Sequence, residues 1–180
     1  MNLRRAFIAL VSLWALTASI AFAAGQVIWE VKPDETQYMK YFGRRVVNVN
    51  RAEAGRLVPQ EFGWQGNQVI FIFNLVSSQI EKPEYQFVFD IIASDYDAGA
   101  PVEPVELDVY AGTNINNLKP VVQGYKITKS GPHTFTIPSS SFYLGAQNFI
   151  RVFGRNVKPI GYGENPPNCR FGMFRLVIPE

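Results

Sequence analysis

Few residues of this 180-residue chain are of the types that carry out catalysis. His133 is the only histidine and Cys169 the only cysteine, so one chain cannot supply a multi-histidine metal site. His133 could activate a nucleophile only together with Cys169 or with Ser139, Ser140 or Ser141. The serines lack a nucleophile-elbow pattern, and no oxyanion-hole signature accompanies Cys169. We therefore predict a protein that is not an enzyme. Cys169 is expected to be a half-buried, inert thiol, and a reactive thiol or an intermolecular link is the alternative.

Paired carboxylates offer one further chemistry. Asp95 and Asp97 flank Tyr96 in a segment that we expect to form a turn. Oxygen ligands two residues apart on a loop suit Ca²⁺, although the spacing is far shorter than that of an EF-hand loop. A solvated turn is the simpler interpretation, and a glycosidase acid and base is a third. A structural calcium ion held by Asp95 and Asp97 is thus the one cofactor that the sequence suggests.

The first 23 residues resemble a secretory signal peptide. Met1–Ala23 begins with Arg4 and Arg5, continues with an apolar run and ends in Ala21-Phe22-Ala23, which places small residues at positions −3 and −1 of the expected cleavage site. We expect a secreted or periplasmic protein whose residues 24–180 form a single domain. No later run reaches the roughly 18 apolar residues of a spanning helix, so no membrane span is predicted in the mature form.

Net charge excludes one class of partner. The chain has 17 Lys and Arg residues against 15 Asp and Glu residues, and Arg4 and Arg5 account for the difference. Once the signal peptide is removed, the formal charges balance. A nucleic acid partner therefore has no electrostatic basis.

The elements that must position any site are predicted to be strands. Apolar residues recur with a period of two in short segments separated by turn residues, and 12 prolines and 14 glycines leave little room for long helices. One or two helical turns are expected only at Asp34–Phe42. We predict an all-β antiparallel sandwich with nine strands: Gln26–Val31, Arg45–Asn50, Gln68–Leu75, Tyr85–Ala93, Val105–Ala111, Val121–Ile127, His133–Ile137, Asn148–Phe153 and Phe171–Ile178.

Two kinds of strand can be distinguished. In Val105–Val109 the apolar and acidic residues alternate, so Glu106 and Asp108 should face water. The segments Val69–Phe73 and Phe87–Ile92 are almost continuously apolar and should form the centre of the core.

The order of these segments resembles the galactose-binding-like β-sandwich, a jelly roll attached to bacterial polysaccharide lyases and glycosidases. The opening Val27–Asp34, with Trp29, is similar to the first strand of that family, although Lys32 replaces a usual glycine, and Asn48–Gln65 does not align. Similar phrases follow at Tyr85–Asp90, Val105–Tyr110, Gly145–Val152 and Phe171–Leu176. The resemblance covers about half of the mature chain. It implies a non-catalytic domain that binds carbohydrate or supports a neighbouring domain, often with a structural calcium ion.

Loop positions predict where a ligand would bind. If each strand crosses the sandwich, the loops 51–67, 94–104, 128–132 and 154–170 share one end, and three of them are long. Aromatic rings can stack on sugars, while Arg and Asn side chains can hydrogen bond to hydroxyl pairs. The predicted carbohydrate-binding residues at this end are Trp64, Tyr96, Arg155, Asn156 and Tyr162.

Two functions therefore remain open. The first is a carbohydrate-binding module that recognises a polysaccharide or glycan through this end of the sandwich. The alternative is a structural or accessory protein, a subunit of an extracellular or periplasmic assembly, that binds another protein through the same surface or a sheet edge.

Overall fold

The computed structural model describes residues 25–32, 44–48, 61–62, 68–79, 82–157 and 167–180. Within them the only helical segments are the short 3₁₀ turns η2 (Ser77–Gln79) and η3 (Ser139–Ser141), and no helix is long and apolar enough to cross a membrane. The expected helical turn Asp34–Phe42 lies outside the described residues. The strands are β1 (Gln26–Val31), β2 (Arg44–Asn48), β3 (Glu61–Phe62), β4 (Gln68–Phe73), β5 (Glu84–Ser94), β6 (Val105–Gly112), β7 (Lys119–Ile127), β8 (Gly131–Pro138), β9 (Asn148–Gly154) and β10 (Cys169–Ile178).

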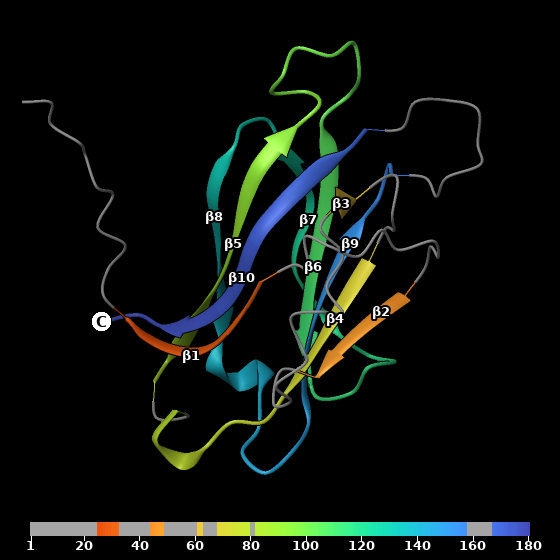
Figure 1. The fold of residues 1–180 in the computed structure, drawn as a ribbon. Coiled ribbons are helices and arrows are strands. Elements are labelled where there is room, and N and C mark those ends of the chain that lie inside the picture. The colour runs from red at the N-terminus through yellow and green to blue at the C-terminus, as the bar shows by residue number, and fades with distance from the viewer. Residues whose placement is uncertain (1–24, 33–43, 49–60, 63–67, 80–81, 158–166) are drawn as a thin grey trace, which may run out of the picture.

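The strands form two facing five-stranded sheets, which confirms the all-β sandwich (Figure 1). One sheet has the order β1-β10-β5-β8, with β3 paired to the start of β10, and all its pairs are antiparallel. The other has the order β2-β4-β9-β6-β7. Its β2–β4 pair is parallel, so the expectation of a wholly antiparallel sandwich was wrong at this edge. Alternation of residue types does not reveal strand direction, which depends on how the chain crosses between the two strands.

Alternating residues place one face of each strand in the core. In β6, Val105, Leu107 and Val109 are fully buried between the sheets. The apolar run in β4 behaves as predicted for an internal strand, because Phe71 and Phe73 face the core and Ile70, on the other face, is also buried. In β5, Phe87 and Phe89 face the core, but Ile92, near the end of the run, is 53% exposed.

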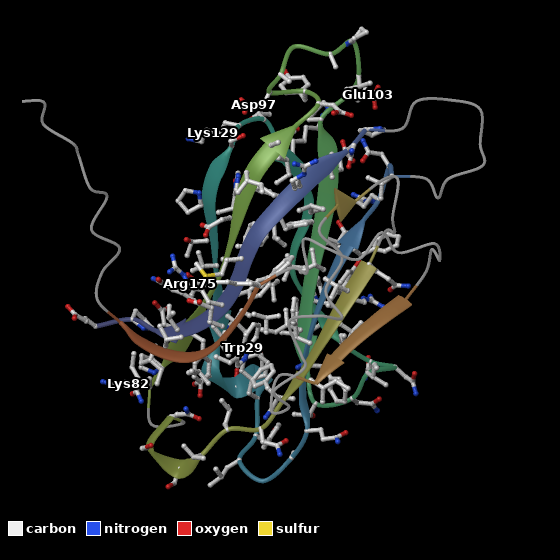
Figure 2. All side chains as sticks on the ribbon, viewed as in Figure 1. Trp29, Lys82, Asp97, Glu103, Lys129 and Arg175 are labelled. Atoms are coloured by element: carbon white, nitrogen blue, oxygen red, sulfur yellow. The ribbon has the colours of Figure 1, made fainter. Side chains whose placement is uncertain are left out.

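Aromatic rings fill the centre of the sandwich. Trp29 of β1 stacks on Phe71 of β4, with ring centroids 5.1 Å apart, and Phe71 contacts Phe174 of β10 at 5.0 Å. Phe87 and Phe89 of β5 extend the same cluster. Rings of this size bury large apolar areas in tilted and stacked pairs, which stabilises the fold without a disulfide. Trp29, 8% exposed, is thus a core residue (Figure 2).

The connections alternate between the two ends of the sandwich, as predicted. Figure 1 shows the β5–β6 and β7–β8 connections at one end and the β4–β5, β6–β7 and β8–β9 connections at the other. Hydrogen bonds join loops at each end, from Ser130 to Asp97 at the first and from Ser139 to Pro83 at the second. The first end is called the β5–β6 end below, and the second the β8–β9 end.

Candidate functional site

His133 is a structural residue between the sheets. Its ring is buried and stacks on Phe89 at 5.5 Å. Nε2 donates to the backbone oxygen of Lys129 at 3.1 Å, which leaves Nδ1 to accept from the Tyr125 hydroxyl at 2.9 Å. Burial lowers the pKa of the imidazole, and the hydrogen bond to Lys129 opposes this effect only in part. Both ring nitrogens are engaged with the protein, so neither is placed to take a proton from a substrate.

The candidate nucleophiles lie away from this histidine. Ser139–Ser141 follow the far end of β8, roughly 20 Å from His133 at ~3.3 Å per residue of strand. Cys169 pairs in register with Ser94, whereas His133 pairs with Phe89. Those two positions on β5 are roughly 17 Å apart by the same rise. Cys169 is 1% exposed, as expected of an inert thiol.

At the β5–β6 end, the structure describes three of the five residues predicted to bind carbohydrate, namely Tyr96, Arg155 and Asn156. Tyr96 is 42% exposed and so accessible to a ligand. Asp97 joins two loops, because its Oδ2 accepts from the hydroxyl of Ser130 at 2.6 Å and from its backbone N–H at 3.2 Å. Asp95 is attached to the β9–β10 loop through its backbone N–H, which donates to Asn168 at 3.1 Å. No three acidic, histidine or cysteine side chains gather into a metal-binding group within the described residues.

Two further predicted residues hold strands together. The Asn156 side chain accepts from the N–H of Glu106 at 2.9 Å and donates to the oxygen of Pro104 at 2.9 Å, which ties the start of β6 to the end of β9. Arg155 pairs with Asp108 at 3.6 Å. The other two predicted residues, Trp64 and Tyr162, lie outside the described residues.

Asp108, expected to face water, is 3% exposed. It lies on the outer face of β6, where its oxygens accept from the Tyr110 hydroxyl at 3.0 Å and from the N–H of Gly124 at 2.8 Å. Together with Arg155 these groups satisfy a buried carboxylate. The face of β6 on which Asp108 lies was therefore predicted correctly, but its exposure to water was not. Groups from β7 and from the end of β9 cover it.

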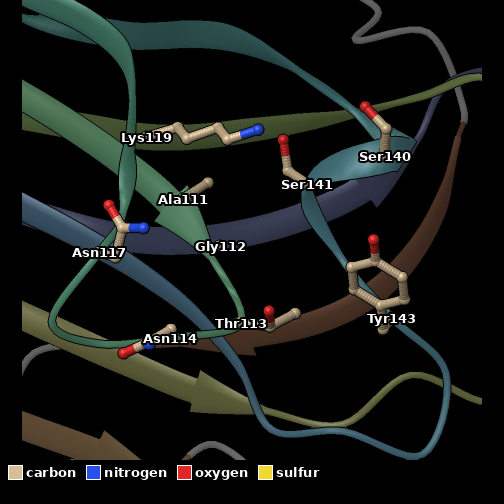
Figure 3. A pocket seen from close by; sticks show the side chains of 9 residues that line it. All are labelled: Ala111, Gly112, Thr113, Asn114, Asn117, Lys119, Ser140, Ser141 and Tyr143. Atoms are coloured by element: carbon tan, nitrogen blue, oxygen red, sulfur yellow. The ribbon is translucent and has the colours of Figure 1, made fainter.

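A polar pocket lies at the β8–β9 end, opposite to the predicted site. Its volume is about 220 Å³. Most of its side chains carry hydroxyl or amide groups (Figure 3), and it is lined by Ala111, Gly112, Thr113, Asn114, Asn117, Lys119, Ser140, Ser141 and Tyr143. Figure 3 shows Ser141, Thr113 and Tyr143 around the pocket, each with a hydroxyl group. The pocket thus combines hydrogen-bonding groups with an aromatic ring, Tyr143, that is 62% exposed.

Buried residues hold one wall of this pocket. Phe142 is packed against Phe73 at 5.1 Å and Tyr85 at 5.4 Å, which anchors η3 and its serines. The buried Asn148 hydrogen bonds to the backbone N–H and oxygen of Tyr143 at 2.8 and 3.0 Å. Tyr143 therefore has a fixed backbone and an accessible ring.

The opposite wall is a compact turn after β6. The side chain of Asn114 accepts from the N–H of Asn116 at 3.0 Å, and its backbone oxygen accepts from the N–H of Asn117 at 2.9 Å. Asparagine commonly shapes turns in this way because its short side chain reaches the backbone two residues ahead. The turn presents Asn114 and Asn117 beside Thr113 at the pocket.

Comparison with known proteins adds no identification. No protein-family model matches the chain, and a search of the curated proteins found no match. Its function must therefore be inferred from the fold and the sites.

This pocket was not predicted from the sequence, because the end of the sandwich with the long loops was expected to bind the ligand. The pocket is built from short connections, residues 113–118 and η3 with the turn that follows it. A local signal exists, since Gly112–Asn117 is almost entirely small and amide residues and Ser139–Tyr143 places three hydroxyl residues before two aromatic ones. Small, amide and hydroxyl residues are also common in ordinary turns, so their presence alone does not indicate a pocket. The two segments lie at the same end of the sandwich because the connections alternate between its ends.

Proposed function

We propose that this protein is a secreted or periplasmic, non-catalytic carbohydrate-binding protein, built on a jelly-roll sandwich of the galactose-binding-like type. The observation that carries the proposal is the polar pocket at the β8–β9 end, with Tyr143 exposed beside Thr113, Asn114, Asn117 and the η3 serines. Both ring nitrogens of His133 are hydrogen bonded, to Tyr125 and to Lys129, which favours a binding protein over an enzyme that uses this histidine as a base.

The chemistry of the pocket suits a sugar. A pyranose presents an apolar C–H face, which stacks on an aromatic ring, and a rim of hydroxyl groups that need both donors and acceptors. Hydroxyl and amide side chains supply both roles. The volume of about 220 Å³ lies below the roughly 300–1,000 Å³ of pockets for drug-sized ligands. A site of this size fits one or two sugar residues of a longer glycan.

The proposal is tested by glycan binding and by variants at the two ends. Purified protein is screened on an array of plant, bacterial and animal polysaccharides, and hits are titrated by calorimetry. We expect Tyr143→Ala to abolish binding and Tyr143→Phe to retain most of it, because stacking needs the ring and not the hydroxyl. Tyr96→Ala is the matched control at the β5–β6 end. Loss of binding in Tyr96→Ala alone would move the site to the end predicted from sequence.

A second candidate function is supported by apolar exposure at the same end. Val76, in the β4–β5 connection, is 57% exposed and Leu144 is 50% exposed. Leu144 follows the exposed Tyr143 directly in the chain. Exposed apolar and aromatic side chains of this kind are typical of surfaces that bind proteins. If no glycan binds to folded protein, and mass measurement shows an oligomer that Leu144→Ser dissociates, the protein-binding alternative replaces the first proposal.

A further inference from the structure

We propose that the pocket selects an acidic sugar, a glycan residue that carries a carboxylate, and that Lys119 is the residue that recognises it. This inference rests on the proposed function, because it names the ligand class of the same pocket. It depends on the positive charge of the pocket and on the finding that Lys119 forms no ion pair among the described residues.

Lys119 opens β7 and lines the pocket together with Asn117 and Ser141. Its side chain extends across the opening, toward the side on which the Ser140 and Ser141 hydroxyl groups lie (Figure 3). Among the described residues, Lys119 takes part in no ion pair, whereas Lys126, further along the same strand, pairs with Glu106 at 3.5 Å. The ammonium group of Lys119 is therefore available to a ligand.

Among the described residues that line the pocket, Lys119 is the only charged one, so no carboxylate of this set offsets its charge. The segments 112–120 and 138–147, which form its walls, contain no Asp or Glu. Glu84, which opens β5 at this end and pairs in register with Pro138, is not among the lining residues. The described lining of the pocket thus carries a single positive charge.

The neighbours of Lys119 complete a carboxylate site. The hydroxyl and amide groups of Ser141 and Asn117 can donate hydrogen bonds to the second oxygen of a carboxylate whose first oxygen pairs with the ammonium group. Charge-assisted hydrogen bonds of this kind are stronger than neutral ones. A neutral sugar would leave the ammonium group without a partner, which gives a preference for the acid.

The test compares two ligands that differ only in charge. Oligogalacturonate and its methyl ester have the same ring and linkage, but the ester carries no carboxylate. We expect the protein to bind the acid about tenfold more tightly than the ester, with the difference shrinking as salt is added. Lys119→Gln should remove this preference by lowering the affinity for the acid to about that for the ester. Lys82→Gln, at an exposed lysine that does not line the pocket, is the matched control and should behave like the wild type.

The outcomes separate this inference from the proposed function. Equal binding of acid and ester, or an equal loss of both in Lys119→Gln, overturns the role of Lys119 and leaves carbohydrate binding standing. Failure of folded protein to bind any glycan overturns both proposals. Polyglutamate is included as a non-sugar polyanion, and binding as tight as that of oligogalacturonate would show general attraction of anions and reject a sugar-specific site.

Discussion

The side-chain amide of Asn148 binds both backbone polar groups of Tyr143, accepting from its N–H at 2.8 Å and donating to its oxygen at 3.0 Å. A third hydrogen bond, to the oxygen of Ala146 at 3.2 Å, extends the link across the turn before β9. Because Asn148 is fully buried, the exposed ring of Tyr143 is connected directly to the core. The pocket is thus held by the fold, and a change far from solvent should alter it.

We therefore expect Asn148→Asp to destabilise the protein and to weaken glycan binding. Aspartate can still accept from the N–H of Tyr143, but an ionised carboxylate cannot donate to the two backbone oxygens and would lie against them. A buried group left without its partner costs about 1–3 kcal/mol, which urea denaturation can measure. The exposed neighbour Gln147 provides the control, and Gln147→Ala should leave both quantities unchanged. Unaltered stability in Asn148→Asp would contradict the hydrogen bonding described for this turn.

Local patterns in the sequence were sufficient to locate most strands, because burial of one strand face imposes a period of two. The prediction of β1 as Gln26–Val31 matches the structure, while β3, Glu61–Phe62, was missed because two residues contain no period. The parallel β2–β4 pair was also missed. Pairing direction depends on the route of the chain between strands, which residue types do not encode.

The site was harder to predict than the fold, because its residues meet through long-range contacts. Asp108 was placed on the correct face of β6, yet its burial depends on Arg155, which is 47 positions away in the chain. Asn156 was chosen for its hydrogen-bonding capacity, and the structure shows that capacity engaged by Glu106 and Pro104. Composition identifies groups that can bind a ligand but does not show which of them the fold already uses.

The contacts of Asp108 predict unequal effects for the two members of its ion pair. Asp108→Ala should lower the free energy of unfolding by about 2 kcal/mol, since it leaves the N–H of Gly124 and the Tyr110 hydroxyl without their acceptor. Arg155→Gln should cost less than about 1 kcal/mol, because the arginine side chain is 48% exposed and water screens its charge. Both values follow from chemical denaturation.

The same Arg155 variant tests the sequence-based prediction that this residue binds carbohydrate. If Arg155 serves mainly as the partner of Asp108, Arg155→Gln should leave glycan affinity within about twofold of the wild type. Binding abolished in a stably folded Arg155→Gln variant would return the site to the β5–β6 end.

The β5–β6 end also yields a prediction about calcium. Oδ2 of Asp97 accepts two hydrogen bonds from Ser130, one from the hydroxyl and one from the backbone N–H. Because a Ca²⁺ ion would have to compete with these two donors for that oxygen, we expect the melting temperature to be the same in calcium and in a chelator. Asp97→Asn should lower stability by less than about 1 kcal/mol, through loss of an exposed contact. A melting temperature that rises with calcium in the wild type but not in Asp97→Asn would instead establish the calcium site.

His133 should make stability depend on pH. Burial lowers the pKa of the folded imidazole, whereas an unfolded histidine titrates near ~6.5. Between these two values the unfolded chain binds more protons than the folded one, so stability is greatest above the unfolded value and falls as the pH decreases toward the folded value. Urea denaturation at several pH values from about 7.5 downward should show this decline.

Two variants test whether His133 causes the decline. In His133→Gln the amide can replace both hydrogen bonds but does not titrate, so stability should fall less as the pH decreases. Lys129→Gln retains the imidazole and should show the same fall in stability as the wild type. An identical dependence of stability on pH in the wild type and in His133→Gln would show that the imidazole does not take up a proton on unfolding in this range. That result would contradict the description of His133 as a buried, neutral ring between Tyr125 and Lys129.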